Sequence, residues 1–290
     1  MIQALIAGNI NAVVLDNASA SDYMVGDIGK YKIASRIPSS YHDTFVYLLR
    51  GNPSPGQPAQ GVFITLRITI FSFLAATILG LFAGLARVSK NIFLYNVSTL
   101  YVEVIRGIPL VVLLLYVAFA LFPLFVGAIQ GIGKWGLSLL PAAGFFQSLN
   151  DFTIRGISME GRAIIALAFG YGAYEAEVFR SGIQSIGKGQ MEAAKSLGMS
   201  YIQGMRFIVL PQAIRRVLPP LGNDFIACLK DSSLATVLAV NELTQLGRML
   251  RASTFRVLET FNVMAFLYLS MTLLLSGFVR WLENKMKIEE

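Results

Sequence analysis

The sequence predicts an all-α integral membrane protein with about five transmembrane helices. Of its 290 residues, 55% are hydrophobic and only 14% are charged, and the mean hydropathy is +0.61. A soluble domain carries about 25% charged residues, because those residues cover the surface that faces water. Long stretches without charge, each of bilayer-spanning length, are the second observation that predicts this fold class.

Three stretches contain no charged side chain: residues 68–86, 107–133 and 260–279. A membrane helix needs about 20 mostly apolar residues, and each stretch provides them. Arg67 and Arg87 bracket the first stretch, as expected for side chains at a bilayer boundary. We therefore expect three strong spans.

Small residues recur in the first of these stretches. Ala76, Gly80 and Gly84 are spaced every four residues and so share one helix face. This spacing predicts a close approach of two helix backbones. The alternative is the ordinary frequency of glycine in membrane helices.

Two weaker spans lie at residues 163–179 and 207–240. Glu175 and Glu177 interrupt the first span. The second is interrupted by Pro211, Pro219, Pro220, Asp224, Lys230 and Asp231. Polar groups are costly in lipid, so we expect these helices to face protein or a water-filled path. Alternatively, charged groups such as Glu175 and Arg215 lie at helix ends and snorkel to the interface.

Basic residues cluster in the segments that we assign to the cytoplasm. They are Arg87, Lys90, Lys188, Lys195, Arg206, Arg215, Arg216, Arg280, Lys285 and Lys287. The positive-inside rule then places the C-terminus in the cytoplasm, and an odd number of spans places the N-terminus outside with loops 129–162 and 241–259. Arg248, Arg251 and Arg256 in the second loop run against this rule.

Few residues are available for metal or nucleic-acid chemistry. His42 and Cys228 are the only histidine and cysteine, so no ordinary zinc site and no intrachain disulfide can form. The net charge of +7 comes without a basic stripe interleaved with aromatic residues. That absence argues against nucleic-acid binding.

The segment 189–211, GQMEAAKSLGMSYIQGMRFIVLP, begins with a predicted short helix. Glu192 is expected in its first turn and Lys195 in its last turn, where both charges complement the helix dipole. Gly198 is expected to end this helix, because glycine accepts the left-handed conformation of a C-terminal cap.

A second helix is predicted directly after the bend. Ser200 and Gln203 have the spacing of a capping box, and Pro211 should perturb the helix where it enters the membrane. Such an element is either a membrane-surface helix or a docking knob for a partner protein.

The order of Glu192, Ala193 and Ala194, then Gly198, then Pro211 resembles the EAA loop of bacterial ABC importer permeases. In that family the loop is the coupling helix, which lies in a groove of the ATP-hydrolysing subunit. The resemblance therefore implies that these five residues couple the chain to an ATPase.

Four further segments resemble the polar amino-acid branch of that family, whose substrates are of the histidine, glutamine and arginine type. They are 101–110 (YVEVIRGIPL), 173–185 (AYEAEVFRSGIQS), 215–220 (RRVLPP) and 229–234 (LKDSSL). The resemblance runs from about Gln60 to Lys285 and implies the type I importer permease fold. Glu175 departs from the apolar or small polar residue expected at its position, which bears on substrate choice.

The resemblance also implies partners. Members of the family work as a pair of permease subunits on a pair of ATPase subunits, and an extracytoplasmic binding protein delivers the amino acid. The chain is then a multi-pass protein of the bacterial inner membrane that performs no bond chemistry and carries no cofactor; ATP and magnesium belong to the ATPase. Which amino acid is carried stays open, as does the choice between two copies of this chain and a sister permease.

We expect the substrate to pass near the charged residues of the spans, because intramembrane charge is costly and is usually functional. These residues are Glu103, Arg106, Glu175, Glu177, Lys230 and Asp231. Structural ion pairs are the alternative. Glu175 and Glu177 are two residues apart and do not share a helix face, which argues against a catalytic carboxylate pair.

Three competing readings of the chain have little support. Residues 182–188 (GIQSIGK) match the spacing of a phosphate-binding loop, but Gly189 replaces the serine or threonine that holds magnesium, and a membrane helix precedes the segment. An ion-driven secondary transporter would be favoured by inverted repeats, which we do not find. A membrane-embedded enzyme would need a nucleophile–base pair or metal ligands.

Residues 1–37 are expected to be an outer extension, 38–59 a linker and 60–285 the transmembrane domain. The extension lacks the charged start and the cleavage site of a signal peptide. It resembles part of one lobe of a periplasmic amino-acid-binding protein, in which an aspartate at the position of Asp16 meets the ligand's amino group. A remnant of a binding domain, a binding domain truncated because the reading frame starts upstream, and an unrelated extension stay open.

Overall fold

The computed structural model describes residues 40–51, 60–139, 144–153 and 157–286. Over these ranges the regular structure is helical, with one isolated β-bridge between Gly61 and Glu242. The prediction of an all-α fold is confirmed. Contacts divide the chain into a smaller unit, Met1–Ile64 with Asn241–Tyr268, and a larger unit, Thr65–Val240 with Leu269–Glu290.

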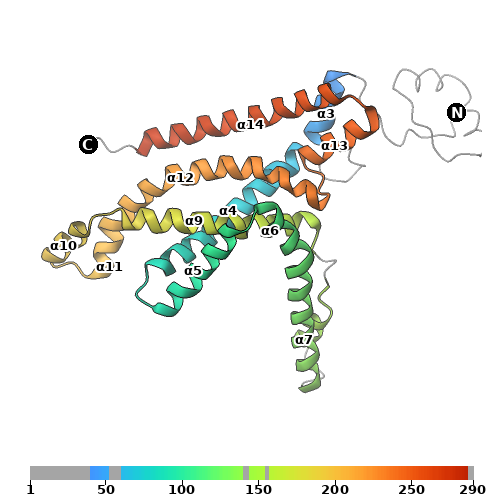
Figure 1. The fold of residues 1–290 in the computed structure, drawn as a ribbon. Coiled ribbons are helices and arrows are strands. Elements are labelled where there is room, and N and C mark those ends of the chain that lie inside the picture. The colour runs from blue at the N-terminus through green and yellow to red at the C-terminus, as the bar shows by residue number, and fades with distance from the viewer. Residues whose placement is uncertain (1–39, 52–59, 140–143, 154–156, 287–290) are drawn as a thin grey trace, which may run out of the picture. The chain divides into compact units, whose positions relative to one another are not determined.

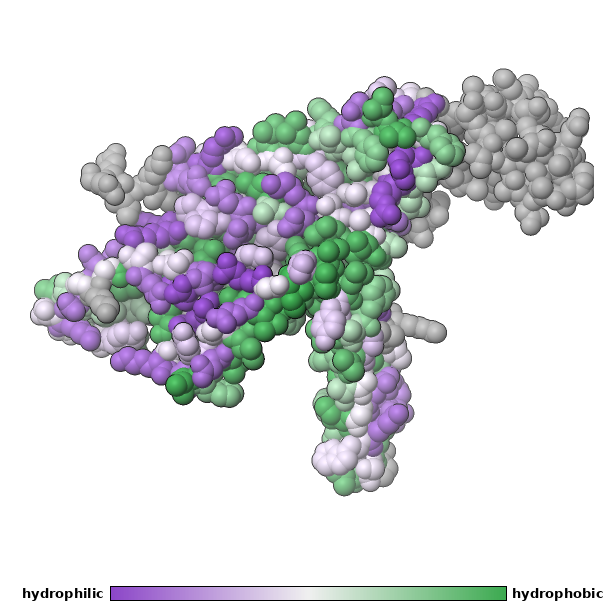
Figure 2. All heavy atoms as spheres, viewed as in Figure 1, coloured by the Kyte–Doolittle hydropathy of each residue, from purple (hydrophilic) through white to green (hydrophobic). Residues whose placement is uncertain are grey.

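Three helices in the described ranges are long and apolar enough to cross a membrane. They are α4 (Val62–Val88), the continuous run of α6 (Leu110–Tyr116), η1 (Val117–Leu121) and α7 (Phe122–Leu139), and α14 (Val257–Met286). They coincide with the three charge-free stretches, so the three strong spans are confirmed as helices. Figure 2 shows apolar side chains gathered over α6 and the start of α7.

The two interrupted spans also form long helices, α9 (Met159–Gln184) and α12 (Leu210–Asp231). Ser158 caps α9 by accepting a hydrogen bond from the Gly161 N–H at 3.1 Å. α12 contains Pro219 and Pro220 without interruption and continues into the 3-10 helix η4 (Ser232–Leu238). α9 packs against α5, α6, η1, α12 and η4, so it lies at the centre of the larger unit (Figure 1).

α4 packs closely against α9 at two glycines. A Cβ atom at Gly80 would collide with the Glu175 Cβ, and one at Gly84 would lie 2.8 Å from the Ala176 carbonyl oxygen. Ala76, one turn earlier, is completely buried. The close backbone approach predicted for this stripe of small residues is therefore confirmed.

The larger unit also contains helices that the sequence did not predict. α5 (Ile92–Gly107) starts at Asn91, whose side chain accepts a hydrogen bond from the Phe93 N–H at 2.9 Å. α8 (Gly144–Asn150) folds back onto α7, with the Phe146 ring against Gly136. The expected outer loop 129–162 therefore begins as a helical hairpin.

The smaller unit contains α3 (Tyr41–Arg50), α13 (Leu243–Thr254) and the first turns of α4 and α14. Leu48, Leu243 and Leu246 form its buried apolar core. The Thr44 hydroxyl donates a hydrogen bond to Glu259 at 2.5 Å. α3 lies within the expected linker 38–59 and α13 within the expected outer loop 241–259; the sequence predicted neither helix.

Two expectations fall outside the described residues. They concern the extension 1–37, including Asp16, and the proline-rich part of the linker, residues 52–58.

Candidate functional site

The segment 189–211 forms two short helices, α10 (Lys188–Ser196) and α11 (Tyr201–Gly204), joined by a bend as predicted (Figure 1). Gly198 has a φ of 78°, in the left-handed region that favours glycine. Its N–H donates to the Lys195 carbonyl at 2.9 Å, and the Met199 N–H donates to the Ala194 carbonyl at 3.1 Å. These two bonds form the glycine cap predicted at Gly198.

The second helix starts with the predicted capping box. The Ser200 hydroxyl accepts a hydrogen bond from the Gln203 N–H at 3.3 Å, and the Gln203 side chain accepts one from the Ser200 N–H at 2.8 Å. A π-helical turn, η3 (Met205–Val209), follows directly before Pro211 at the start of α12. The perturbation near Pro211 is therefore a local widening of a continuing helix.

The Glu192-Ala193-Ala194 motif turns one side chain inward and two outward. Ala194 is fully buried beside Gly204, whereas Glu192 and Ala193 are exposed. Lys195 lies in the last turn of α10 as predicted. The placement of Glu192 in the first turn was wrong, because Gly187 is the N-cap and α10 begins at Lys188.

Large apolar side chains protrude around the bend. Leu197 is 81% exposed, Ile202 75% and Tyr201 60%. Apolar side chains that protrude together from a polar loop mark an interaction site.

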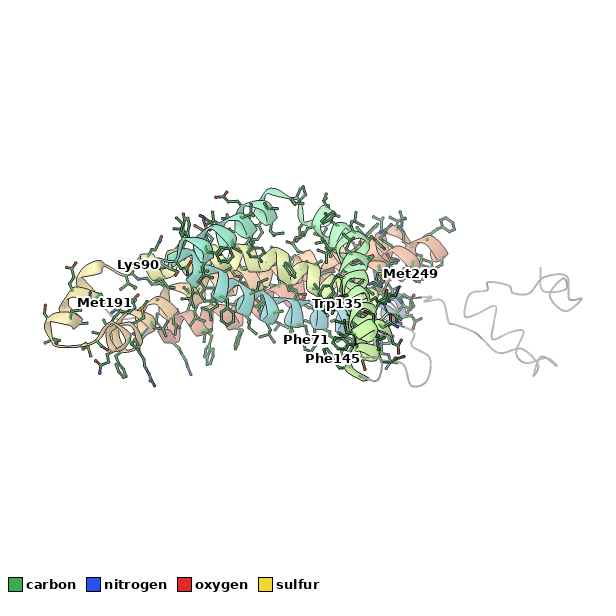
Figure 3. All side chains as sticks on the ribbon, turned by 90° about the horizontal axis from the view of Figure 1, so that it is seen from below. Phe71, Lys90, Trp135, Phe145, Met191 and Met249 are labelled. Carbon is green, nitrogen blue, oxygen red and sulfur yellow. The ribbon has the colours of Figure 1, made fainter. Side chains whose placement is uncertain are left out.

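A small core joins this loop to the long helices. Ile186, Val209 and Ala213 are buried in it, and Met191 and Met205 pack against them. Figure 3 labels Met191 on this loop. In addition, the Arg216 guanidinium of α12 donates to the Ser185 carbonyl at the end of α9, at 2.8 Å. A displacement of the loop would therefore act on both α9 and α12.

A polar cleft of about 460 Å³ opens between α4, α5 and α9. It is lined by Arg87, Val102, Glu103, Arg106, Gly107, Tyr174 and Glu177. Three of the predicted substrate-path residues, Glu103, Arg106 and Glu177, come together here from two helices. Charges of both signs thus face one space, as a zwitterionic ligand would require.

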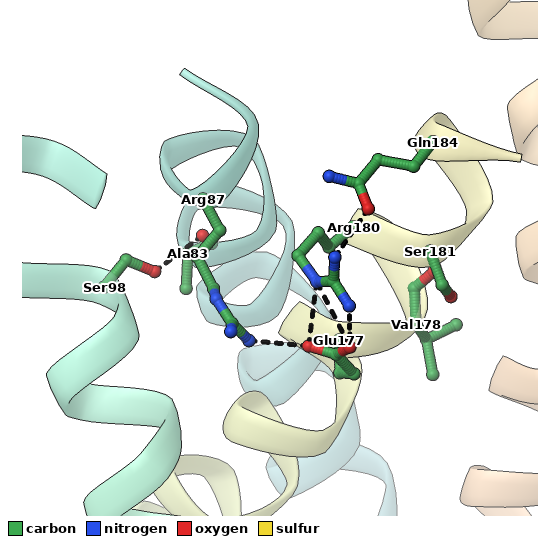
Figure 4. Close-up of polar contacts among 8 residues, drawn as sticks. All are labelled: Ala83, Arg87, Ser98, Glu177, Val178, Arg180, Ser181 and Gln184. Atoms are coloured by element: carbon green, nitrogen blue, oxygen red, sulfur yellow. Dashed lines mark hydrogen bonds and ion pairs between the residues drawn. The ribbon is translucent and has the colours of Figure 1, made fainter. Parts of the chain in front are cut away.

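Two arginines neutralise Glu177 in this cleft. Arg87 of α4 donates to its carboxylate at 2.6 Å, and Arg180, one turn further along α9, forms a second ion pair with it (Figure 4). Glu103 and Arg106 are in none of the ion pairs found in the described ranges. The Arg106 guanidinium instead lies 5.2 Å from the centre of the Tyr174 ring.

The other three predicted path residues do not line the cleft. Glu175 is fully buried against α4, and in the described part of the chain neither of its carboxylate oxygens has a hydrogen-bond partner. Asp231 accepts a hydrogen bond from the Tyr171 hydroxyl at 2.7 Å. Lys230 is exposed.

Sequence reasoning missed Arg87 and Tyr174 as cleft residues. Arg87 was expected only to flank the first span, and Tyr174 only to belong to a family-like segment. The available signal for Arg87 was the intramembrane Glu177, whose charge requires a basic partner from another helix.

Comparison with known proteins decides the family. Residues 76–288 match the family described as "Binding-protein-dependent transport system inner membrane component". The chain belongs to this family. It is a multi-pass inner-membrane permease, and a permease of this kind works with a binding protein and an ATPase.

Two curated relatives cover most of the permease. The glutamine transport system permease protein GlnP of Escherichia coli (strain K12) is 37% identical over 229 residues, which are 79% of this chain and 92% of that protein. The L-cystine transport system permease protein TcyB of Bacillus subtilis (strain 168) is 36% identical over 217 residues, 74% of this chain and 80% of that protein.

Solved structures confirm the predicted type I importer permease fold. A crystal structure of an amino acid ABC transporter with histidines has a TM-score of 0.63 and 28% identity, and the match covers 94% of the permease and 100% of that chain. The inward-facing MetNI methionine ABC transporter has a TM-score of 0.59 and 19% identity over 79% of the permease and 95% of that chain, which shows a shared fold.

Proposed function

We propose that the chain is the permease subunit of an ABC importer that moves polar amino acids across the bacterial inner membrane. Its relatives over most of the chain are named as glutamine and cystine permeases. The chain carries out no bond chemistry in this role. ATP and magnesium are bound by a separate ATPase subunit.

The proposal rests on the loop α10–α11, which we assign as the surface that contacts the ATPase. Glu192 and Ala193 face outward, and Leu197 and Ile202 are exposed on either side of the Gly198 bend. Ala194 and Pro211 form the inner side and the membrane entry of the same element. Because this loop is packed onto α9 and α12, it would convert closure of the ATPase pair into movement of these two helices.

The full assembly that we propose contains two permease subunits, two ATPase subunits and an extracytoplasmic binding protein. The second permease is either another copy of this chain or a sister chain. In this assembly the N-terminus lies outside and the C-terminus lies in the cytoplasm, because basic residues flank the loop and the chain end.

The polar cleft is our candidate for the substrate path. Arg106 would pair with the carboxylate of an amino acid and Glu103 with its ammonium group, since both charged side chains line the cleft without an ion-pair partner in the described ranges. Glu177 is held by arginines and would shape the cleft. Glu175, Lys230 and Asp231 stay candidates away from the cleft. Of these, Glu175 would act without a charge, because it is fully buried and its carboxylate oxygens have no hydrogen-bond partner in the described ranges.

The first experiment tests coupling with the tagged full chain, extracted gently from its native membrane. We expect an ATPase subunit to co-purify in comparable amount, and mass spectrometry will also show whether a sister permease is present. Gly198→Asp should abolish transport and release the ATPase. It puts a side chain into a left-handed position and a negative charge at the C-terminal end of α10, and both are unfavourable.

Gly189→Asp is the matched control. It adds the same charge to α10 near its N-terminus, where a negative charge is favourable and a new Cβ meets no atom within 4 Å. Transport should therefore stay near normal. Normal uptake in Gly198→Asp would refute the coupling role, and absence of any ATPase in several mild detergents would point to an ion-driven transporter.

The cleft is tested by neutralising its charges one at a time and measuring the apparent KM for uptake. Arg106→Gln and Glu103→Gln should each raise it by about tenfold or more, the loss expected for a charge-assisted hydrogen bond. Lys134→Gln, which neutralises an exposed charge on α7 away from the cleft, is the comparison. If Arg106→Gln and Glu103→Gln leave the KM unchanged, the cleft is not the substrate path.

A further inference from the structure

The second half of α14 has an exposed apolar face that ends in aromatic and basic residues. Leu274 is 77% exposed, Phe278 57% and Trp281 51%. Their spacing of four and then three residues continues to Lys285, so the four side chains share one face of the helix. Figure 2 shows hydrophilic residues following apolar ones toward the C-terminal end of α14.

The order of these side chains follows the polarity of a bilayer. Leucines contact hydrocarbon, tryptophan favours the headgroup level and lysine reaches the water. From Leu269, which is 56% exposed, to Trp281 the helix rises about 18 Å, slightly more than half of a hydrocarbon core about 30 Å thick. Trp281 therefore lies at headgroup depth when Leu269 lies near the bilayer centre.

The aromatic and basic side chains form a local cluster. The Phe278 and Trp281 rings are stacked with centroids 5.8 Å apart, and the Lys285 ammonium lies 4.3 Å from the centre of the Trp281 ring. The ring contact holds the ammonium beside the helix at the headgroup level.

The cluster carries a positive charge that the described residues do not neutralise. Arg280, adjacent to Trp281, is exposed like Lys285, and the ion pairs found in the described ranges involve neither residue. Glu283 is the acidic residue of this part of α14, but it lies about 200° around the helix from Trp281. An anion at headgroup depth would therefore meet two basic groups and a tryptophan.

We propose that Arg280, Trp281 and Lys285 bind the phosphate headgroup of an anionic phospholipid. A bilayer surface supplies this anion, and basic side chains at such a surface attract anionic lipid. The acyl chains of the bound lipid lie along the exposed face at Phe278 and Leu274. Binding of a lipid at this site is a property separate from amino-acid transport. The proposal does not depend on which side of the membrane the C-terminus lies.

The chain has two tryptophans, Trp135 and Trp281, which makes each of them available as a reporter. The full-length Trp135→Phe variant leaves Trp281 as the only tryptophan. It is reconstituted into equimolar bilayers of phosphatidylglycerol and phosphatidylcholine in which the acyl chains of one lipid or the other are brominated. Bromine quenches a tryptophan at short range, so the ratio of the two quenching efficiencies reports the local lipid composition.

We expect brominated phosphatidylglycerol to quench Trp281 several-fold more efficiently. One basic side chain near a surface corresponds to an enrichment of about fivefold. When Arg280→Gln and Lys285→Gln are added to the Trp135→Phe variant, the ratio of the two quenching efficiencies should fall close to one. Both positions are exposed, so these substitutions remove no buried contact.

The Trp281→Phe variant combined with Lys134→Gln is the matched control, because it leaves Trp135, which is 66% exposed, without its basic neighbour. Its ratio should be close to one. Equal quenching of Trp281 by the two lipids overturns the proposal. The proposal is also overturned if brominated phosphatidylglycerol still quenches Trp281 more efficiently after both Arg280→Gln and Lys285→Gln have been introduced. A preference of the same size at Trp135 overturns a local site in favour of diffuse attraction.

Discussion

At the scale of single residues, two acidic side chains are fully buried but differ in their surroundings. Glu242 caps α13 and accepts hydrogen bonds from the backbone N–H groups of Thr244 and Gln245, each at 2.7 Å. Both carboxylate oxygens of Glu175 lack a partner in the described ranges. An unpartnered buried charge is far more costly than a hydrogen-bonded one. The two acids should therefore respond differently to neutralisation.

Glu175→Gln should leave transport within about twofold of the unmodified chain, because the amide has the same shape and removes no ion pair. Uptake of the amino acid in vesicles measures this. Glu177→Gln, two residues away, is the comparison; it removes the ion pairs with Arg87 and Arg180 and should reduce uptake strongly. A loss at Glu175 as large as that at Glu177 would show that the negative charge of Glu175 is needed.

Glu242 should make stability dependent on pH. Burial raises its pKa to about 7, although the hydrogen bonds from Thr244 and Gln245 lower it. Because the folded pKa is above the unfolded value of 4.5, the stabilisation is complete below pH 4.5 and is lost as the pH rises through about 7. The thermal midpoint in detergent should fall over this range. Glu242→Gln should flatten the curve, and an unchanged slope in that variant would contradict the assignment.

At the scale of helices, glycines decide which pairs pack closely. Gly80 and Gly84 bring α4 against α9, and Gly222 of α12 brings the helix against Val279 of α14. α9 and α12, the helices that carry the charged and proline-bearing segments, pack on each other. Close packing of small residues replaces the hydrophobic effect as the force between helices in lipid.

Gly80→Ala should destabilise the permease by about 1–3 kcal/mol, because the new Cβ collides with the Cβ of Glu175 and forces α4 away from α9. The thermal midpoint of the detergent-solubilised protein measures the effect. Gly131→Ala in α7 is the control, since a Cβ there meets no atom within 4 Å and alanine favours the helix. Equal midpoints for the two variants would show that α4 and α9 are not tightly packed.

At the scale of the whole molecule, the orientation in the membrane is the main expectation to test. Cys228 is the single cysteine and is buried, so Cys228→Ala provides a cysteine-free background. Leu197, near the coupling bend, is 81% exposed, and Leu258, in the expected outer loop 241–259, is 77% exposed. Both positions are suitable for a single introduced cysteine.

In spheroplasts, whose inner membrane is accessible from outside, a membrane-impermeant maleimide should label Leu258→Cys and leave Leu197→Cys unlabelled. Inside-out vesicles stripped of the ATPase should give the opposite result; the ATPase is removed because it would otherwise cover Leu197. The reason is the positive-inside rule, which places the basic loop and tail in the cytoplasm. Labelling of Leu197→Cys from outside would reverse the orientation, and labelling of both cysteines from one side would contradict the single span expected between residues 197 and 258.

The sequence by itself determined the features whose physical cause is local. Charge-free stretches predicted three spans, since lipid requires a run of apolar residues in one segment. Gly198, Ser200 and Gln203 predicted the bend of the coupling loop, because caps are made by residues within one turn of each other. The spacing of Ala76, Gly80 and Gly84 predicted a packing face, though not which helix would meet it.

Only the tertiary structure decided which side chains share a site. Glu175 and Glu177 were grouped by sequence, yet they face different neighbours, because residues two apart on a helix point in different directions. Glu177 meets Arg87, which is 90 residues away in the chain, and the cleft exists because α4, α5 and α9 meet there. Such contacts depend on how helices pack, and no short segment of sequence contains that information.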